Sequence, residues 1–156
     1  MSELFEAIDP DLNYFPDSLN SPCTLHTVEE YVLLSRDKNF MNVLNYNIRS
    51  FYSNSNTFLP IVDISKPHVL VLTETWFTDD YHPSIVNYEA YHSIRSNRSG
   101  GVSVYAINNL DSRKVDELSY VNENIEVCTI EINFPNEKLY VTGIYRPHSG
   151  TTENMS

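Results

Sequence analysis

One apolar run stands out in the pattern of hydrophobic and polar positions along the chain. Residues 69–73 read VLVLT with no polar interruption, as expected for a strand buried on both faces. Residues 40–46 predict a strand before it. Between the two, residues 57–65 predict a helix with Thr57 as N-cap, Pro60 in the first turn and apolar side chains along one face. This strand–helix–strand order predicts an α/β layered domain.

The second half of the pattern predicts antiparallel strands. A polar loop covers residues 74–87, and Gly100 and Gly101 suit a turn that needs positive φ. The strands that follow are joined by short turns, which favours antiparallel pairing. Their expected ranges are 88–95, 102–107, 125–133 and 139–145, with a hairpin turn at 134–137.

Composition and the density of turn residues divide the chain into three parts. Residues 1–38 form an acidic, turn-rich leader, in which residues 27–34 predict one short helix. Residues 39–150 hold the other predicted elements, and residues 151–156 are a polar-leaning tail that we interpret as truncated. We therefore expect a single, partial domain between the leader and the tail.

Charge and composition exclude several classes of protein. The formal net charge is −11, whereas a surface that attracts nucleic acid or an anionic membrane needs an excess of Lys and Arg. The two cysteines lie far apart, so we expect neither a structural zinc site nor a disulfide framework. The sequence shows no signal-peptide pattern and no apolar stretch long enough for a membrane span. These features predict an intracellular protein, cytoplasmic or nuclear, that is not secreted and not in a membrane.

Two polar side chains follow the two predicted strands of the strand–helix–strand unit. Glu74 comes directly after the buried run, and Asn47 comes just after the strand before it. Such a unit brings both to one edge of the sheet, where open α/β folds bind ligands. Oxygen ligands suit Mg²⁺, which takes one or two carboxylates and keeps several waters. The alternatives are a solvated loop glutamate and an asparagine that caps a turn.

A second pair of candidates ends the last predicted strand. Tyr145 and Arg146 precede a proline, and a hydroxyl and a guanidinium at the edge of a sheet can contact a phosphate. The alternative is a tyrosine that packs on the proline. Other arginines that could gather at this rim as a basic surface are Arg49, Arg95, Arg98 and Arg113.

Four motifs, in this order and at these separations, resemble a known family. The segments VLNYNIRSF, VLVLTETWF, RSNRSGGVSVY and LYVTGIYRPHSG look like the endonuclease/exonuclease/phosphatase superfamily, nearest to the apurinic-type endonuclease domain of non-LTR retrotransposons. The resemblance covers about residues 40–149. It implies the N-terminal half of a four-layer α/β/β/α sandwich with a mostly antiparallel mixed sheet. It also implies a DNA endonuclease that depends on Mg²⁺ or Mn²⁺.

The resemblance further implies roles for the residues that match its motifs. Glu74 would be the metal ligand, and Asn47 would belong to the metal and phosphate shell of the catalytic site. Tyr145 would contact the scissile phosphate or orient the attacking water. Arg98, just before the glycine turn, would contact the substrate. Trp76 is expected to pack the loop rather than touch the substrate.

The chain departs from the family pattern after Tyr145. The family next has an Asp-x-Asn strand and a closing Asp-His, and neither follows here; the only Asp-x-Asn is residues 11–13 in the leader. We therefore expect the second sheet to be absent and the inward face of the first sheet to be uncovered. Loss of a general base alone would slow the reaction by roughly 10²–10⁴-fold, so we expect the chain to be inactive by itself.

Two other functions stay open at this point. The first is a catalytically dead relict, or an interaction module that binds a partner or itself through the uncovered sheet face. The second is a phosphatase for a lipid or nucleotide headgroup, because the same fold hosts such enzymes.

Overall fold

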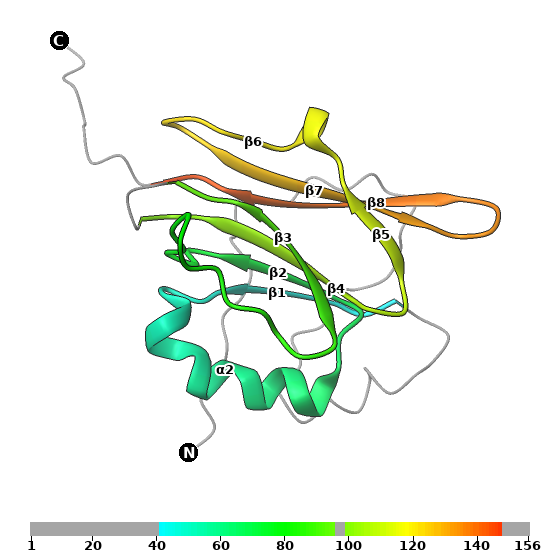
Figure 1. Ribbon diagram of the computed structural model, residues 1–156, viewed down its shortest axis with the longest axis horizontal. Coiled ribbons are helices and arrows are strands. Elements are labelled where there is room, and N and C mark those ends of the chain that lie inside the picture. Colours follow the sequence, from blue (N-terminus) through cyan, green and yellow to red (C-terminus); the bar gives the residue numbers. More distant parts are fainter. Residues whose placement is uncertain (1–40, 96–98, 148–156) are drawn as a thin grey trace, which may run out of the picture.

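The computed structural model describes residues 41–95 and 99–147. The first of its two sheets contains β1 (Val43–Asn47), β2 (Val69–Thr73), β3 (Tyr88–Ser93) and β4 (Val102–Ile107). These strands lie in the order β1-β2-β4-β3; β1 and β2 are parallel, and the other neighbours are antiparallel. The helix α2 (Phe51–Ser65) connects β1 to β2 and lies along one face of this sheet (Figure 1).

The second sheet lies on the other face of the first, so the described residues form three layers (Figure 1). Its strands are β5 (Asp111–Lys114), β6 (Tyr120–Val121), β7 (Glu126–Asn133) and β8 (Lys138–Tyr145). All pairs in it are antiparallel, and β7 is central because β5, β6 and β8 each pair with it. A short 3-10 turn, Asp116–Leu118, lies between β5 and β6.

Alternation along β2 explains how two separate cores form. Leu70 and Leu72 face α2, where they meet Phe58 and Val62 of the helix. The intervening valines of β2 point the other way, into a core between the two sheets. That inter-sheet core comprises Val69, Val71, Val102, Val104, Ala106, Cys128, Ile130 and Ile132. The unbroken apolar run of β2 is thus buried on both faces, as its sequence predicts.

The expectation that the second sheet is absent is wrong. Strands β5 to β8 form it, and the Cys128, Ile130 and Ile132 side chains of β7 cover the inward face of the first sheet. Alternation in a sequence shows that a strand has a buried face, but not which sheet the strand joins. The proposed interaction through an uncovered first sheet therefore has no surface to use in the described residues.

The start of α2 is also corrected. The helix begins at Phe51 rather than near Thr57, and Ser50 is its N-cap, accepting a hydrogen bond from the Ser53 backbone N–H at 3.4 Å. Pro60 therefore lies inside the helix instead of in the first turn. Residues 53–56, which are all Ser or Asn, have weak helix propensity. Phe51, however, packs on Phe77, with ring centroids 5.5 Å apart. Tertiary packing decides the boundary.

The other boundaries follow the pattern more closely. Strands β2 and β4 have the predicted bounds, and Gly100 and Gly101 have the expected positive φ of 69° and 90°. Strands β5 and β6 were not predicted, because they are short edge strands with little alternation. The leader, including the helix expected at residues 27–34, lies outside the described residues. Within the described part of the chain, no helix is long and apolar enough to cross a membrane.

A buried glutamate on the outward face of β7 accepts hydrogen bonds from three side chains. Glu131 accepts hydrogen bonds from Tyr140 Oη at 2.6 Å and from Lys138 Nζ and Arg113 Nε, both at 3.0 Å. These three donors lower the pKa of Glu131 to about 2. The carboxylate is therefore ionised at neutral pH and held by polar partners rather than by the core.

Gly143 marks the closest approach of β8 to the first sheet. A Cβ at this position would lie 2.7 Å from Val102 Cγ1 and 2.8 Å from Val71 Cγ1, both in the inter-sheet core. We expect Gly143→Ala to lower the free energy of unfolding by about 1–3 kcal/mol, the usual cost of overpacking a core. Urea unfolding measures this loss. Thr142→Ala, on the outward face of the same strand, is the control, and equal losses in the two variants would contradict the close approach.

Candidate active site at the rim of the two sheets

Parallel pairing of β1 and β2 brings the first two candidates together. Asn47 is in register with Thr73, so the next residue, Glu74, lies beside it. Asn47 Nδ2 donates a hydrogen bond to Glu74 Oε1 at 2.8 Å, and Asn47 Oδ1 accepts one from the Arg49 backbone N–H at 3.2 Å. The sequence argument that the two side chains meet at one sheet edge is therefore correct in geometry.

Tyr145 joins this pair from the second sheet. Strand β8 lies against β2, so its last residue comes to the rim where β2 ends. Burial raises the pKa of Tyr145, and the neighbouring Glu74 carboxylate raises it further through its charge and a hydrogen bond. The phenol is therefore protonated at neutral pH and acts as a hydrogen-bond donor to the carboxylate.

The backbone around Glu74 is held in an uncommon conformation. Glu74, Trp76 and Ser50 have positive φ values of 53°, 57° and 80°, which non-glycine residues seldom adopt. Hydrogen bonds hold them: the Ser50 N–H donates to the Glu74 carbonyl at 2.8 Å, and the Trp76 N–H donates to the Gly100 carbonyl at 2.9 Å. Such strain costs about 1–3 kcal/mol per residue and is concentrated at functional sites in proteins generally.

A buried ion pair supports the glycine turn behind the rim. The side chain of Glu126 is fully buried, lies 2.5 Å from Arg95 Nε and accepts a hydrogen bond from the Gly101 backbone N–H. Burial raises the pKa of Glu126, and the Gly101 N–H and the Arg95 charge oppose that rise. The sequence analysis did not identify Glu126 as a functional residue. The alternation of β7 could have done so, because residues two apart on a strand lie on the same face. Glu126 shares the core-facing side of β7 with Cys128, where a carboxylate needs a partner.

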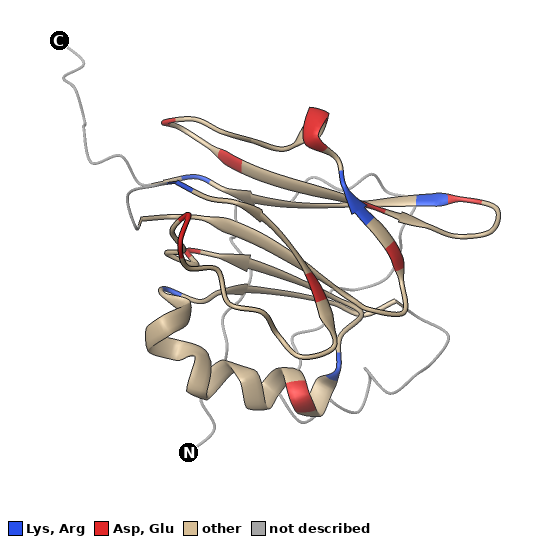
Figure 2. Ribbon diagram, in the orientation of Figure 1, with Lys and Arg blue, Asp and Glu red and all other residues tan. Residues whose placement is uncertain are grey.

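Three of the four candidate arginines that the structure describes lie near the rim, and Arg113 does not. Arg49 and Arg146 are exposed there, just after Ile48 and Tyr145. Arg95 is held by the buried Glu126, which is in register with Tyr145. Arg113 pairs with Glu131, about 17 Å along β7 from the rim end of that strand. Figure 2 shows basic residues at both ends of the second sheet. Arg98 lies outside the described residues.

The loop after Glu74 exposes its tryptophan. The Trp76 side chain is 45% exposed, so it does not pack beneath the loop as expected; Phe77, 1% exposed, fills that place. Trp76 instead borders a pocket between this loop and the start of α2. The sequence shows both aromatic residues but does not indicate which one is buried.

The polar groups at the rim fit a weakly held divalent cation. Glu74 is a partly exposed carboxylate with an amide and a phenol beside it, and Mg²⁺ is commonly held by one or two carboxylates with waters completing its shell. Among residues 41–95 and 99–147, no group of three or more His, Cys, Asp and Glu side chains is arranged to hold a metal. A cation here would therefore depend on Glu74.

Searches with protein-family models and among curated proteins give no match. Solved structures do match. One is an AP endonuclease from Leishmania major, with a TM-score of 0.54 and 17% identity over 70% of this chain and 42% of that one. Another is the endonuclease domain of TRAS1, a telomere-specific non-LTR retrotransposon, with a TM-score of 0.51 and 12% identity over 68% of this chain and 46% of that one.

The chain has an AP-endonuclease-like fold. This confirms, for the fold, the resemblance read from the four sequence motifs, and it confirms the mixed α/β class with its mostly antiparallel sheets. The chain spans less than half the length of the two structures that it matches. At these identities the match concerns the nuclease-like fold alone. Any catalytic chemistry depends on the side chains of Asn47, Glu74 and Tyr145 at the rim.

Proposed function

We propose that this chain supplies the metal-binding part of a divalent-metal-dependent phosphodiesterase site that acts on DNA. The observation that carries the proposal is the Asn47–Glu74 hydrogen bond of 2.8 Å at the rim, with Tyr145 beside it from the other sheet. Two structures that share the fold are an AP endonuclease and a retrotransposon endonuclease domain, which favours nucleic acid over other phosphodiesters.

Glu74 would hold the cation, Mg²⁺ or Mn²⁺. A bound divalent ion offsets negative charge that develops on a phosphate and lowers the pKa of a bound water. Asn47 orients the Glu74 carboxylate through its amide N–H, and the backbone of Arg49 orients Asn47 in turn. These two hydrogen bonds hold the carboxylate at the rim.

Tyr145 would bind the phosphate of the substrate. Its phenol is protonated at neutral pH, since burial and the Glu74 charge both disfavour the phenolate. A neutral O–H donor can hydrogen-bond a phosphate oxygen without adding negative charge to the site. Arg146 follows Tyr145 in sequence, and its exposed guanidinium would make a charge-assisted contact to the phosphate backbone of the DNA.

Glu74→Gln tests the proposal, because it removes the charge and keeps the size of the side chain. We expect this variant to bind Mn²⁺ at least about 10- to 100-fold more weakly than the unmodified chain, measured by electron paramagnetic resonance titration. Any nicking of supercoiled plasmid by the unmodified chain should require Mg²⁺ or Mn²⁺ and be lost in the variant.

Glu89→Gln is the matched control, because Glu89 is an exposed acid on β3 away from the rim. Mn²⁺ binding that is unchanged in Glu74→Gln would overturn the metal assignment. Binding of Mn²⁺ through Glu74 together with no nicking at all would instead favour the catalytically dead alternative.

A further inference from the structure

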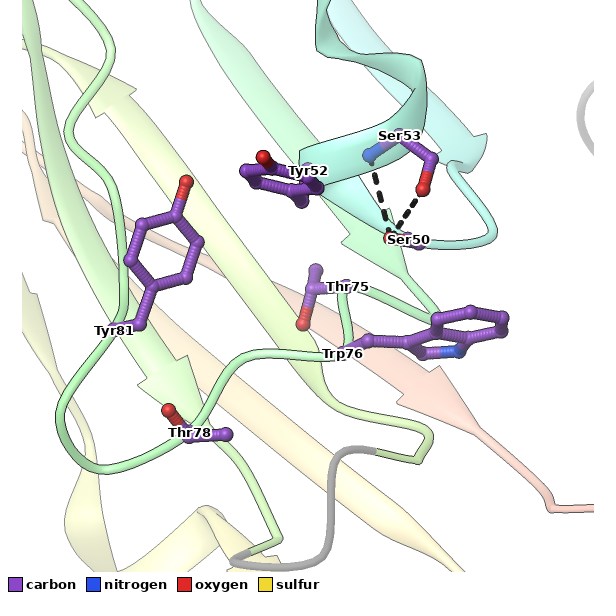
Figure 3. Close-up of a pocket in the computed structure, with 7 residues that line it drawn as sticks. All are labelled: Ser50, Tyr52, Ser53, Thr75, Trp76, Thr78 and Tyr81. Carbon is purple, nitrogen blue, oxygen red and sulfur yellow. Dashed lines mark hydrogen bonds between the residues drawn. The ribbon is translucent and has the colours of Figure 1, made fainter.

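A pocket of about 520 Å³ opens beside the rim, between the start of α2 and the loop that follows Glu74 (Figure 3). Its size is within the range of small-ligand sites in proteins, about 300–1,000 Å³. The residues that line it are Ser50, Tyr52, Ser53, Thr75, Trp76, Thr78 and Tyr81. None of these lining residues is charged, so the pocket is not built to hold a phosphate.

Aromatic rings and hydroxyl groups make up most of the lining. Tyr52 is 80% exposed, and Trp76 and Tyr81 are each 45% exposed. Figure 3 shows the two tyrosines on one side and the indole extending on the other, with Thr75 and Ser50 between them. The tyrosine rings meet edge to face, with centroids 6.4 Å apart. Exposed flat rings beside hydroxyl groups suit a planar ligand with polar edges.

The backbone that carries the indole is held in a strained conformation. Trp76 has φ 57°, a value that is a genuine outlier for a bulky residue, and its N–H is bound to the Gly100 carbonyl. The preceding N–H, of Thr75, donates to the Gly101 carbonyl at 3.3 Å. The adjoining Phe77 is buried, so the loop is anchored on both sides of the exposed ring. A ring presented at such a cost is a candidate for binding a ligand.

The pocket adjoins the candidate metal site along the chain, because Thr75, which lines it, directly follows Glu74. Glu74, Thr75 and Trp76 are consecutive, so the Cα atoms of the carboxylate and the indole are within about 7 Å of each other. A nucleic-acid strand whose phosphate lies at Glu74 would bring a neighbouring base to this pocket. This step depends on the function proposed above.

We propose that the pocket binds an unpaired base of DNA next to the phosphate at the rim, with the base stacked on Trp76. Tyr52 and Tyr81 form the opposite wall, and the lining hydroxyls contact the polar edge of the base. Stacking on aromatic side chains tolerates any base, because every base has a π face. The substrate class is therefore single-stranded or locally unpaired DNA.

The only tryptophan of the chain makes the proposal measurable. A thymidine homo-oligonucleotide is titrated into the full chain with Ca²⁺ in place of Mg²⁺, while Trp76 fluorescence is recorded. We expect quenching by this oligonucleotide, and little quenching by a backbone of equal length that lacks bases. Tyr52→Ala and Trp76→Ala should each weaken binding about 5- to 150-fold, measured by anisotropy of a labelled strand.

Two controls separate stacking from other effects. Tyr120→Ala removes a 50% exposed tyrosine on β6 and should leave binding unchanged. Trp76→Phe keeps a flat ring and should retain most of the affinity. Circular dichroism melts verify the folding of each variant, and Tyr52→Ala carries the test if Trp76→Ala does not fold.

The outcomes distinguish the pocket from the metal site. Quenching that persists in Glu74→Gln supports the pocket even if metal-dependent nicking fails. Equal binding of the oligonucleotide and the base-free backbone overturns the stacking proposal and leaves the role of Glu74 standing. Preference for fully paired duplex over the single strand also overturns it.

Discussion

Arg95→Met is expected to destabilise the protein by about 3–5 kcal/mol at pH 7, because it leaves a buried carboxylate without its ionic partner. The partner, Glu126, has a fully buried side chain 2.5 Å from Arg95 Nε. Its remaining donor is the Gly101 N–H, which does not neutralise the charge. Guanidinium chloride unfolding of both proteins at pH 7 gives the difference.

The loss should become smaller in acid. Burial raises the pKa of Glu126 above its unfolded value, so protonation is favoured in the folded state and falling pH adds stability through this group. Without Arg95, protonation removes the unpaired charge, and we expect a smaller deficit at pH 5 than at pH 7. A deficit that stays constant with pH would show that the arginine acts through packing alone.

Arg113→Met is the matched control, because it removes the arginine of another Arg–Glu pair. Arg113 has a side chain that is 59% exposed, and Glu131 keeps Lys138 and Tyr140 as donors. The loss of stability in Arg113→Met should therefore be much smaller than in Arg95→Met, because exposed ion pairs contribute little. Equal losses for the two arginines would contradict the special position of Glu126.

Phe77→Ala is expected to lower the free energy of unfolding by about 3–5 kcal/mol, the range for truncating a buried aromatic side chain. Phe77 is 1% exposed, and its ring contacts those of Phe51, Tyr81 and His92 at centroid distances of 5.5, 6.4 and 5.4 Å. These contacts tie the loop after Glu74 to the start of α2 and to β3. Urea unfolding measures the loss.

The same substitution should alter the pocket. Because Phe77 anchors the loop next to Trp76, its truncation should change the tryptophan emission of the folded protein and weaken oligonucleotide binding. Phe58→Ala is the control: Phe58 is equally buried but packs in the middle of α2, against Tyr46. It should cost similar stability and leave Trp76 emission unchanged. A similar spectral change in both variants would argue against a local role for Phe77.

The predictable part of the candidate site lies where strands end. The apolar run of β2 and the register of β1 beside it required only sequence pattern, and they brought Asn47 next to Glu74. Tyr145 was selected from its motif and its strand-end position. Its contact with Glu74 depends on how β8 crosses β2, which no local pattern encodes.

The residues that sequence reasoning missed depend on long-range packing. Glu126 was overlooked because a glutamate within an alternating strand normally faces solvent, whereas here the Arg95 side chain and the Gly101 N–H let it face the core. Trp76 and Phe77 are adjacent aromatic residues, but the first is exposed and the second is buried. Phe77 is buried against Phe51 and His92, whereas Trp76, with its left-handed φ, is exposed.

By itself, the sequence determined the strand–helix–strand core, the antiparallel strands that follow and the positive-φ glycine turn. These depend on local periodicity, turn chemistry and the burial of continuous apolar runs. Only the tertiary structure decided that β5 to β8 form a second sheet, that α2 begins at Phe51, and that an aromatic pocket adjoins Glu74. The physical reason is that each of these depends on contacts between segments far apart in the chain, whose packing energy outweighs local propensity.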